Sequence, residues 1–487
     1  MNTNLKGLSP GEVWEKFGEI VRIPRPSRHE EAIRAYLVAE ARAHGIACTV
    51  DGVGNVILRK PATSGMESRK GIVLQAHMDM VPQKNGDKRF DFTKDPIEVR
   101  VDGEWVRADG TTLGADNGIG VAAILAVMES RDIVHGPLEA LITATEETGM
   151  VGARGLKGGM LDGEILVNLD SETEGELYVG CAGGLDASVR MAYCEKSVPA
   201  GHTALRVEVG GLKGGHSGID IHLGRGNANR ILFRLLREGE RTCGLRLASV
   251  DGGGLRNAIP REAAAMVIVP AAAADAFRTL AENFETLLKE EYRGVDDAVT
   301  VRVTDVELPA SLIGRQTQEQ LIRAVRGCPD GVIRMSPSMP GLVQTSSNLA
   351  RVVAGNGEIL VHCLLRSSLD SEKADLGDRI AGVFELAGAD VALEGSYDGW
   401  NPNPDSPILH TMVASYELLF GRRPAVTAIH AGLECGIIGT NYPALDMISF
   451  GPTILHPHSP DEKVNIASVG RFWRYLLATL RNAPFRS

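Results

Sequence analysis

Side chains that can bind metal ions follow apolar runs in several places within one hundred residues of this chain. Three of the runs, 71–76, 138–144 and 164–169, are predicted to be buried strands. The candidate ligands that follow these strands are His77 and Asp79, Glu146 and Glu147, and Asp170. A further candidate, Asp116, lies just before the predicted helix 118–129. Open α/β sheets bind their ligands at the carboxyl ends of strands. The pattern therefore predicts a metal centre at one edge of a sheet.

The residue types indicate which metals this centre suits. Carboxylates and imidazoles without thiolates favour zinc, manganese or cobalt, and two such ions can share a bridging carboxylate and a bridging water, as in dinuclear metal hydrolases. His77 and Asp79 point to the same face of an extended strand, so Asp79 can orient the imidazole. One of the adjacent Glu146 and Glu147 is expected to ligate and the other to move a proton. The residues alone leave open which Glu has which role.

Each element of the pattern also has a simpler explanation. A His-x-Asp pair often only forms hydrogen bonds, and Asp116 alone is typical of a helix N-cap. Glu146 and Glu147 alone are typical of a surface loop. Two adjacent carboxylates at the mouth of a buried strand repel each other, however, unless a cation or a proton lies between them. The combination therefore favours a metal centre over the separate explanations.

Composition excludes several classes of protein. The chain has 487 residues, 44% of them hydrophobic, which is typical of a globular protein of two or three domains. Its longest apolar stretch, 263–274, contains Pro270 and is shorter than the ~18 residues of a membrane helix, and residues 1–10 lack a signal pattern. Seven cysteines without a Cys-x-x-Cys pair favour reduced thiols in a cytoplasm. The net charge of −11 disfavours nucleic acid and membrane surfaces as partners.

The order of predicted elements indicates a split domain. Residues 1–183 alternate helix and strand signals, with helix starts predicted at Ser9-Pro-Gly-Glu12 and Ser27-Arg-His-Glu30. Residues 184–398 follow a βαββαβ order and then a second, similar unit, which predicts a separate α+β domain. Residues 399–487 return to the α/β pattern. Phosphate-loop, His-Glu-x-x-His and Gly-x-Ser-x-Gly motifs do not occur, and Ser217 in Gly-Gly-His-Ser-Gly misses the last of these by one glycine.

Taken in order, these motifs resemble the cocatalytic zinc exopeptidases, and among them the aminoacyl-histidine dipeptidases. The resemblance spans nearly the whole chain. Besides the candidate ligands it rests on the segments Ile23-Pro-Arg-Pro-Ser-Arg-His-Glu-Glu31, Gly211-Leu-Lys-Gly-Gly-His-Ser-Gly218, Arg256-Asn-Ala-Ile-Pro-Arg-Glu262, His430-Ala-Gly-Leu-Glu-Cys-Gly436 and Pro457-His-Ser-Pro-Asp-Glu462. It implies an α/β catalytic domain (1–183 and 399–487) split by an inserted α+β lid domain (184–398).

The resemblance also implies a role for each site residue. Asp116 would bridge two metal ions, His77 and Asp170 would complete one site, and Glu147 and His458 the other. Glu146 would be the general base and Asp79 the carboxylate that orients a ligand. His458 is chosen over His456 because it holds the family's His-Ser-Pro-Asp-Glu position. The remaining histidines that we considered are expected to be structural: His202, His222, His362, His410, His430 and His456.

In the lid, the resemblance implies four substrate contacts. These are His216, Asn257, Arg366 and the backbone around Gly432, which would hold the substrate carboxylate and the developing oxyanion. Simpler alternatives are a turn cap for Asn257 and a solvated strand-end charge for Arg366.

The activity implied is hydrolysis of dipeptides with a free amino terminus, including Xaa-His compounds such as carnosine. It would use two divalent ions, expected to be Zn²⁺, with Mn²⁺ or Co²⁺ as alternatives, and a homodimer is an expected assembly. An N-acyl amino acid deacylase or a tripeptidase is an alternative, because pocket shape decides between these substrates. A non-catalytic peptide- or metal-binding relative is another. An iron redox enzyme fits poorly, since carboxylates outnumber imidazoles.

Overall fold

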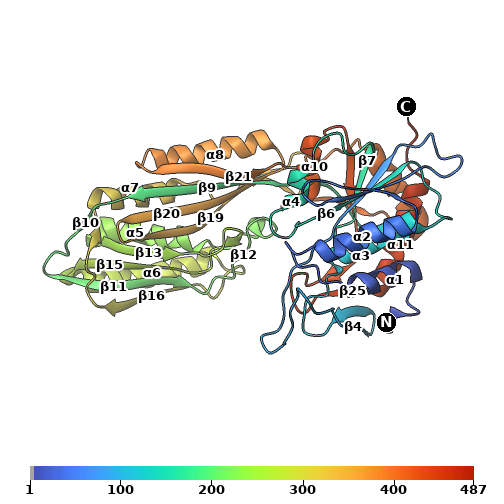
Figure 1. Ribbon diagram of the computed structural model, residues 1–487. Helices are drawn as coiled ribbons and strands as arrows, with labels where there is room; N and C mark the ends of the chain where they lie inside the picture. Colours follow the sequence, from blue (N-terminus) through green and yellow to red (C-terminus); the bar gives the residue numbers. More distant parts are fainter. Residues whose placement is uncertain (1–4, 487) are drawn as a thin grey trace. The chain divides into compact units, whose positions relative to one another are not determined.

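The computed structural model describes residues 5–486, which form two compact units. Unit 1 contains the residues up to Cys181, Trp400–Ala428 and those from Leu433 onward, and unit 2 contains Ala182–Gly399 and Ile429–Gly432 (Figure 1). These limits lie within two residues of the segments 1–183, 184–398 and 399–487, with one difference. Residues 429–432, including Gly432, belong to unit 2 although they lie within the last segment.

Unit 1 is built on an eight-stranded sheet in the order β1-β2-β6-β3-β7-β23-β8-β22. Its central strands β6, β3, β7 and β23 are parallel, as expected for a sheet covered by helices. The strands are β1 (Ala47–Val50), β2 (Val56–Lys60), β3 (Ile72–His77), β6 (Leu138–Thr143), β7 (Ile165–Asn168), β8 (Glu176–Cys181), β22 (Ala425–Ile429) and β23 (Asp446–Ser449).

Apolar runs explain why the centre of this sheet forms. Every residue of β3, β6 and β7 is buried, which is typical of parallel strands with helices on both faces. Helix α3 (Ala115–Glu129) is apolar on all sides and packs against α1 (Gly11–Ile20) and β3. The other helices of unit 1 are α2 (Glu31–Ala43), α4 (Val151–Gly155), α9 (Pro407–Phe420), α10 (Glu434–Asn441) and α11 (Ile466–Arg481).

A second, four-stranded sheet in unit 1 brings distant parts of the chain together. Its order is β24-β25-β5-β4, in which β25 (Lys463–Asn465) pairs with β5 (Trp105–Ala108). The outer strands are β24 (Ile454–Leu455) and β4 (Val99–Asp102). His458 lies in the loop between β24 and β25, so this small sheet fixes that loop beside the segment that leads into α3.

Unit 2 is a nine-stranded antiparallel sheet with four long helices. Eight strands follow the order β16-β11-β15-β13-β19-β20-β9-β21, and β18 pairs with β19. The strands are β9 (Gly183–Ala192), β11 (His202–Gly210), β13 (Arg246–Gly252), β15 (Ala263–Pro270), β16 (Thr300–Val306), β18 (Gly331–Met335), β19 (Val343–Gly355), β20 (Glu358–Ser367) and β21 (Asp390–Tyr397). The two halves meet where β13 pairs with β19 over three residues.

Helices α5 (Ala228–Cys243), α6 (Ala274–Glu291), α7 (Arg315–Gly327) and α8 (Asp370–Glu385) pack on the strands of unit 2 through a common apolar core. Short two-stranded pairs complete the unit: β10 (Glu195–Lys196) with β17 (Leu312–Ile313), and β12 (Gly215–His216) with β14 (Ala258–Ile259). The last pair carries His216.

Two local predictions were wrong. Neither predicted N-terminal serine caps its helix: α1 begins after Pro10 and α2 after Glu30, both without a side-chain cap hydrogen bond. Ser27 instead donates a hydrogen bond to Asp79 at 2.8 Å. In addition, the apolar pattern predicts a strand near 349–354, but β19 begins at Val343, and its first half, Gln344–Asn348, is polar and buried.

All seven cysteines are free thiols. Across residues 5–486, no helix combines the length and the apolar character needed to cross a membrane.

Candidate metal centre

The parallel register brings the candidate ligands of unit 1 to one edge of the sheet. In the pairing of β3 with β6, His77 lies opposite Thr143, the last residue of β6, and Glu146 and Glu147 follow shortly after. In the pairing of β3 with β7, Gln75 lies opposite Asn168, and Asp170 follows two residues later. β3 and β6 thus end at the same level and β7 two residues earlier, which places the side chains that follow them together.

Distances within this group are short. The Nε2 atom of His77 lies 3.0 Å from Asp116 Oδ1 and 3.3 Å from Asp170 Oδ1. The Nε2 atom of His458 lies 3.1 Å from Asp116 Oδ2 and 3.0 Å from Glu147 Oε2. Asp116 therefore contacts both imidazoles, one through each carboxylate oxygen.

These side chains form groups that could hold metal ions. One group is His77, Asp116 and Asp170, a second is Asp116, Glu147 and His458, and in each the potential ligand atoms lie within 4.8 Å of one another. His77 also groups with Glu146 and Glu147. The buried Oε1 atom of Glu147 has no hydrogen-bond partner. A buried, unpaired carboxylate oxygen beside an imidazole fits a divalent cation.

Asp79 lies behind this cluster and contacts several of its members. It is fully buried, and one of its oxygens lies 3.4 Å from His77 Nδ1, a distance at the limit of a hydrogen bond. The same carboxylate accepts the backbone N–H groups of Glu146 at 2.9 Å and Glu147 at 3.2 Å. Asp79 thus holds the turn that carries both glutamates, besides facing the imidazole.

Protons occupy this centre when no cation is bound. Burial alone would lower the pKa of His77, but the charge of Asp170 and hydrogen bonds to Asp116 and Asp170 raise it well above its usual value. Hydrogen bonds to Asp116 and Glu147 raise the pKa of His458 to about 11. Burial raises the pKa of Glu146 well above its usual value and that of Asp170 to about 6. In the metal-free protein these shifts favour the protonated form of both imidazoles.

Metal binding is expected to release protons. An imidazole must lose its proton to ligate, so loading Zn²⁺ at pH 7 should release at least the protons of His77 and His458, and affinity should rise with pH below their raised pKa values. Calorimetry in buffers of different ionisation enthalpy measures the number of protons released. A heat of binding that does not depend on the buffer would contradict protonated imidazoles in the metal-free centre.

Some contacts of this region were not foreseen from the sequence. Ser27 bonds to Asp79, and Glu434 accepts hydrogen bonds from Gln75 and Thr143, both at 2.6 Å. Burial also raises the pKa of Glu172, near Asp116 and Asp170, to about 9. Ser27 and Glu434 lie in segments that carry the family resemblance, and Glu172 follows the candidate ligand Asp170 by two residues.

In unit 2, the structure brings His216, Asn257 and Arg366 together. His216 pairs with Ala258 across β12 and β14, and the carbonyl of Asn257 accepts the Ser217 N–H at 2.8 Å. Arg366 is buried on β20 and donates to the Tyr397 hydroxyl at 3.1 Å, while its Nε has no partner. The Asn257 side chain is exposed. The alternative that Arg366 is a solvated charge at a strand end is therefore wrong.

Close approach of the chain at Gly218 links these residues to the segment with Gly432. A Cβ atom on Gly218 would lie 2.0 Å from the His430 carbonyl and 3.1 Å from Arg366 Nε. The His430 ring bonds to Ser346 at 2.7 Å and is buried, and burial with the charge of Arg366 lowers its pKa to about 3. Gly432 follows two residues later. Only glycine fits at Gly218 without moving this backbone.

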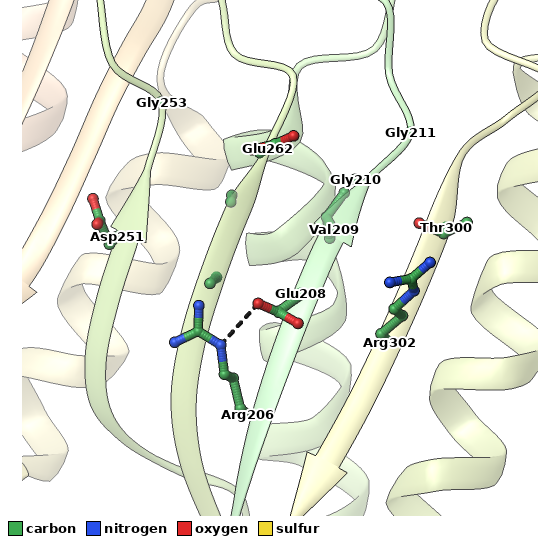
Figure 2. Close-up of a pocket in the computed structure, with 12 residues that line it drawn as sticks. Arg206, Glu208, Val209, Gly210, Gly211, Asp251, Gly253, Glu262, Thr300 and Arg302 are labelled. Carbon is green, nitrogen blue, oxygen red and sulfur yellow. Dashed lines mark hydrogen bonds and ion pairs between the residues drawn. The ribbon is translucent and has the colours of Figure 1, made fainter.

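A separate pocket of about 480 Å³ lies on the sheet of unit 2, lined by charged and small residues of β11, β13, β15 and β16. Figure 2 shows Arg206 and Glu208 projecting into it, with an ion pair of 2.8 Å between them. None of the candidate ligands or predicted substrate contacts lines it. The pocket therefore gives no information on the metal centre.

Comparison with known proteins supports the same family along the whole chain. Residues 73–482 match the model of peptidase family M20/M25/M40. The cytosol non-specific dipeptidase of Escherichia coli (strain K12) is 46% identical over 482 residues, which cover 99% of each chain. The solved structure of aminoacylhistidine dipeptidase from Vibrio alginolyticus is also 46% identical, with a TM-score of 0.93 over 100% of this chain and 99% of that one.

A more distant solved structure shares the fold. Aminopeptidase PepT from Bacillus cereus ATCC 10987 is 16% identical, with a TM-score of 0.63 over 98% of this chain and 99% of that one. The mixed α/β fold and the resemblance predicted from the motifs are thus confirmed. This chain belongs to peptidase family M20/M25/M40.

Proposed function

We propose that this protein is a metal-dependent dipeptidase whose centre holds two divalent ions. The observation that carries the proposal is the pair of potential ligand groups that share Asp116, one with His77 and Asp170 and one with Glu147 and His458. Three carboxylates with two imidazoles suit Zn²⁺, with Mn²⁺ and Co²⁺ as alternatives. Peptidase family membership supports a hydrolase over a binding protein.

The proposed mechanism divides work between the ions and the side chains. When bound, divalent ions would lower the pKa of water and polarise the peptide carbonyl. Glu146 accepts the proton of the attacking water and passes it to the leaving amine. Its carboxyl is buried beside other acids, and burial raises its pKa in the metal-free protein. Asp79 keeps the glutamate turn and the His77 ring in place.

His216 is proposed to donate a hydrogen bond to the oxyanion. Its Nδ1 accepts backbone N–H groups from Gly218 at 3.1 Å and Ile219 at 3.0 Å, so the proton of the neutral ring is on Nε2. Burial and the charge of Arg366 lower its pKa to about 4, so the ring is neutral above that pH. Arg366, Asn257 and the backbone at Gly432 are proposed to bind the substrate, Arg366 through the substrate carboxylate.

Replacing His216 by Ala is expected to lower kcat by about 10²–10³-fold, the effect of losing one oxyanion donor, while metal content stays near two ions per chain. Its pH profile should keep the shape of the wild type, because the ring does not titrate near pH 6–7. Steady-state kinetics with metal analysis of the same sample measures both. Equal loss of kcat and metal would indicate misfolding and not loss of a donor.

The proposed substrates are dipeptides with a free amino terminus, including Xaa-His dipeptides such as carnosine. The two relatives that are 46% identical support this, because their names are non-specific dipeptidase and aminoacylhistidine dipeptidase. The test is a panel of dipeptides that includes carnosine, N-acetyl-carnosine and a tripeptide. Cleavage of the free-amine dipeptides alone supports the proposal. Cleavage of the acetylated compound alone would favour the deacylase, and cleavage of the tripeptide alone the tripeptidase.

Three further points belong to this proposal. Residues 184–398 are proposed to act as the lid domain of the enzyme. A cytoplasmic location is proposed because the E. coli relative is named for the cytosol. Assembly as a homodimer follows from the family resemblance and is tested by analytical ultracentrifugation.

A further inference from the structure

Glu462 binds the segment that leads to Asp116 through its carboxylate. Oε2 accepts the backbone N–H groups of Leu113 at 2.7 Å and Gly114 at 2.9 Å. Oε1 accepts those of Ala115 at 2.7 Å and Asp116 at 3.3 Å. The side chain is 2% exposed. One carboxylate thus satisfies four consecutive backbone donors at the beginning of α3, including that of the proposed bridging residue.

Arg25 binds one carbonyl of the same segment and two carbonyls after β3. The guanidinium donates to the carbonyls of Gly114 at 2.5 Å, Asp79 at 2.7 Å and Met78 at 3.0 Å, and Arg25 is 1% exposed. A Cβ atom on Gly114 would lie 2.6 Å from Arg25 Nη2, and φ is +70° there. Only glycine therefore allows both this backbone conformation and the contact with Arg25.

The two charged groups act on opposite sides of one peptide segment. The N–H of Gly114 bonds to Glu462 and its carbonyl to Arg25. Burial lowers the pKa of Arg25, and the charge of Glu462 counters this more than that of any other acid. A buried charged group is costly unless it is hydrogen-bonded, and here each of the two groups is held by backbone partners. Glu462 lies four residues after His458, so its bonds to Leu113–Asp116 also connect the loop of His458 to the loop of Asp116.

We propose that Arg25 and Glu462 are positioning residues that hold Leu113–Asp116 in the metal-binding conformation before any cation binds, and thereby set the metal affinity of the centre. This inference rests on the proposed function, since it assumes that Asp116 and His458 ligate. Neither residue touches the reacting atoms. Asp79 belongs to the same arrangement, because Arg25 binds its carbonyl while its carboxylate faces His77.

Metal affinity of Glu462→Gln tests the proposal. The amide keeps the size of the side chain but replaces one acceptor oxygen by a donor, so the Leu113–Asp116 backbone loses partners. We expect Co²⁺ or Zn²⁺ affinity, measured by competition with a chromogenic chelator, to fall at least about tenfold, as for other residues that orient ligands. Excess metal should restore most of kcat with KM unchanged.

Glu139→Gln is the matched control in the same unit. Glu139 is 6% exposed, accepts the backbone N–H groups of Asp162 at 2.8 Å and Gly163 at 2.7 Å, and pairs with Arg59 at 3.1 Å. It lies at the start of β6, the end of the strand away from Glu146. We expect Glu139→Gln to lower thermal stability, as Glu462→Gln should, but to change metal affinity less than twofold.

Hydrogen exchange of the metal-free protein gives a second readout. The amides of Leu113–Asp116 should exchange faster in Glu462→Gln than in the wild type and in Glu139→Gln. Unchanged metal affinity in Glu462→Gln, or an equal loss in both variants, would overturn the inference. If Glu462→Gln does not fold, Arg25→Lys is judged by the same criteria, since lysine keeps the charge but not the three carbonyl contacts. A wild type that binds no metal would overturn the proposed function itself.

Discussion

Replacing Glu146 by Gln is expected to lower kcat by about 10²–10⁴-fold while both metal ions remain bound. Glutamine keeps the shape of the side chain but cannot accept a proton from water. The Asp79 carboxylate binds the backbone of Glu146 and not its side chain, so the turn should keep its geometry. Turnover of a dipeptide and metal content by mass spectrometry, measured on one preparation, test this expectation.

Glu147→Gln is the control for this prediction and also decides the roles of the two glutamates. The Glu147 carboxylate contacts His458 at 3.0 Å and belongs to one of the potential ligand groups, so its variant should lose metal. Near-normal kcat in Glu146→Gln would reject this residue as the base. Loss of metal from Glu146→Gln, with retention in Glu147→Gln, would exchange the two roles.

Replacing Asp116 by Asn is expected to weaken both metal sites and to reduce turnover below detection. Its two carboxylate oxygens contact His77 and His458 separately, and an amide offers only one oxygen for two ions. The loss of affinity should exceed the about 10–100-fold that is typical of residues orienting a ligand. Equilibrium dialysis against Zn²⁺ gives the number of ions bound and the affinity.

Asp79→Asn provides the comparison for Asp116→Asn. Asp79 faces the Nδ1 side of His77 and the backbone of the glutamate turn, so both sites should remain and bind about 10–100-fold more weakly. Two ions bound to Asp116→Asn with wild-type affinity would contradict the proposed bridge.

The parallel core and its candidate ligands could be predicted because both depend on local sequence. An apolar run such as Leu138–Ala144 can only be buried, and polar side chains directly after it must lie at the strand end. Once the strands are parallel and in register, their ends meet, as those of β3, β6 and β7 do. Helix α3 was expected from Gly118, and its regular turns do begin after Asp116 and Asn117, whose backbone angles are not helical.

Contacts that depend on residues distant in the chain could not be predicted. Ser27 follows the pattern of a helix cap, yet its hydroxyl donates to the distant Asp79 carboxylate, and α2 begins only after Glu30. Glu462 and Leu113 are far apart in the sequence, and no periodicity marks their contact. The first half of β19 is polar and buried, which a hydropathy pattern reads as a loop. In these places tertiary hydrogen bonding overrides the local signal.

The most direct test of the metal centre is a titration of chelated protein with Zn²⁺, in which bound metal and turnover of a free-amine dipeptide are measured at each step. The proposed centre predicts no turnover without metal, two ions bound per chain at saturation, and full activity only near the second equivalent. Turnover by the metal-free protein, or undiminished metal binding and activity in a His77→Ala and His458→Ala double variant, would contradict it.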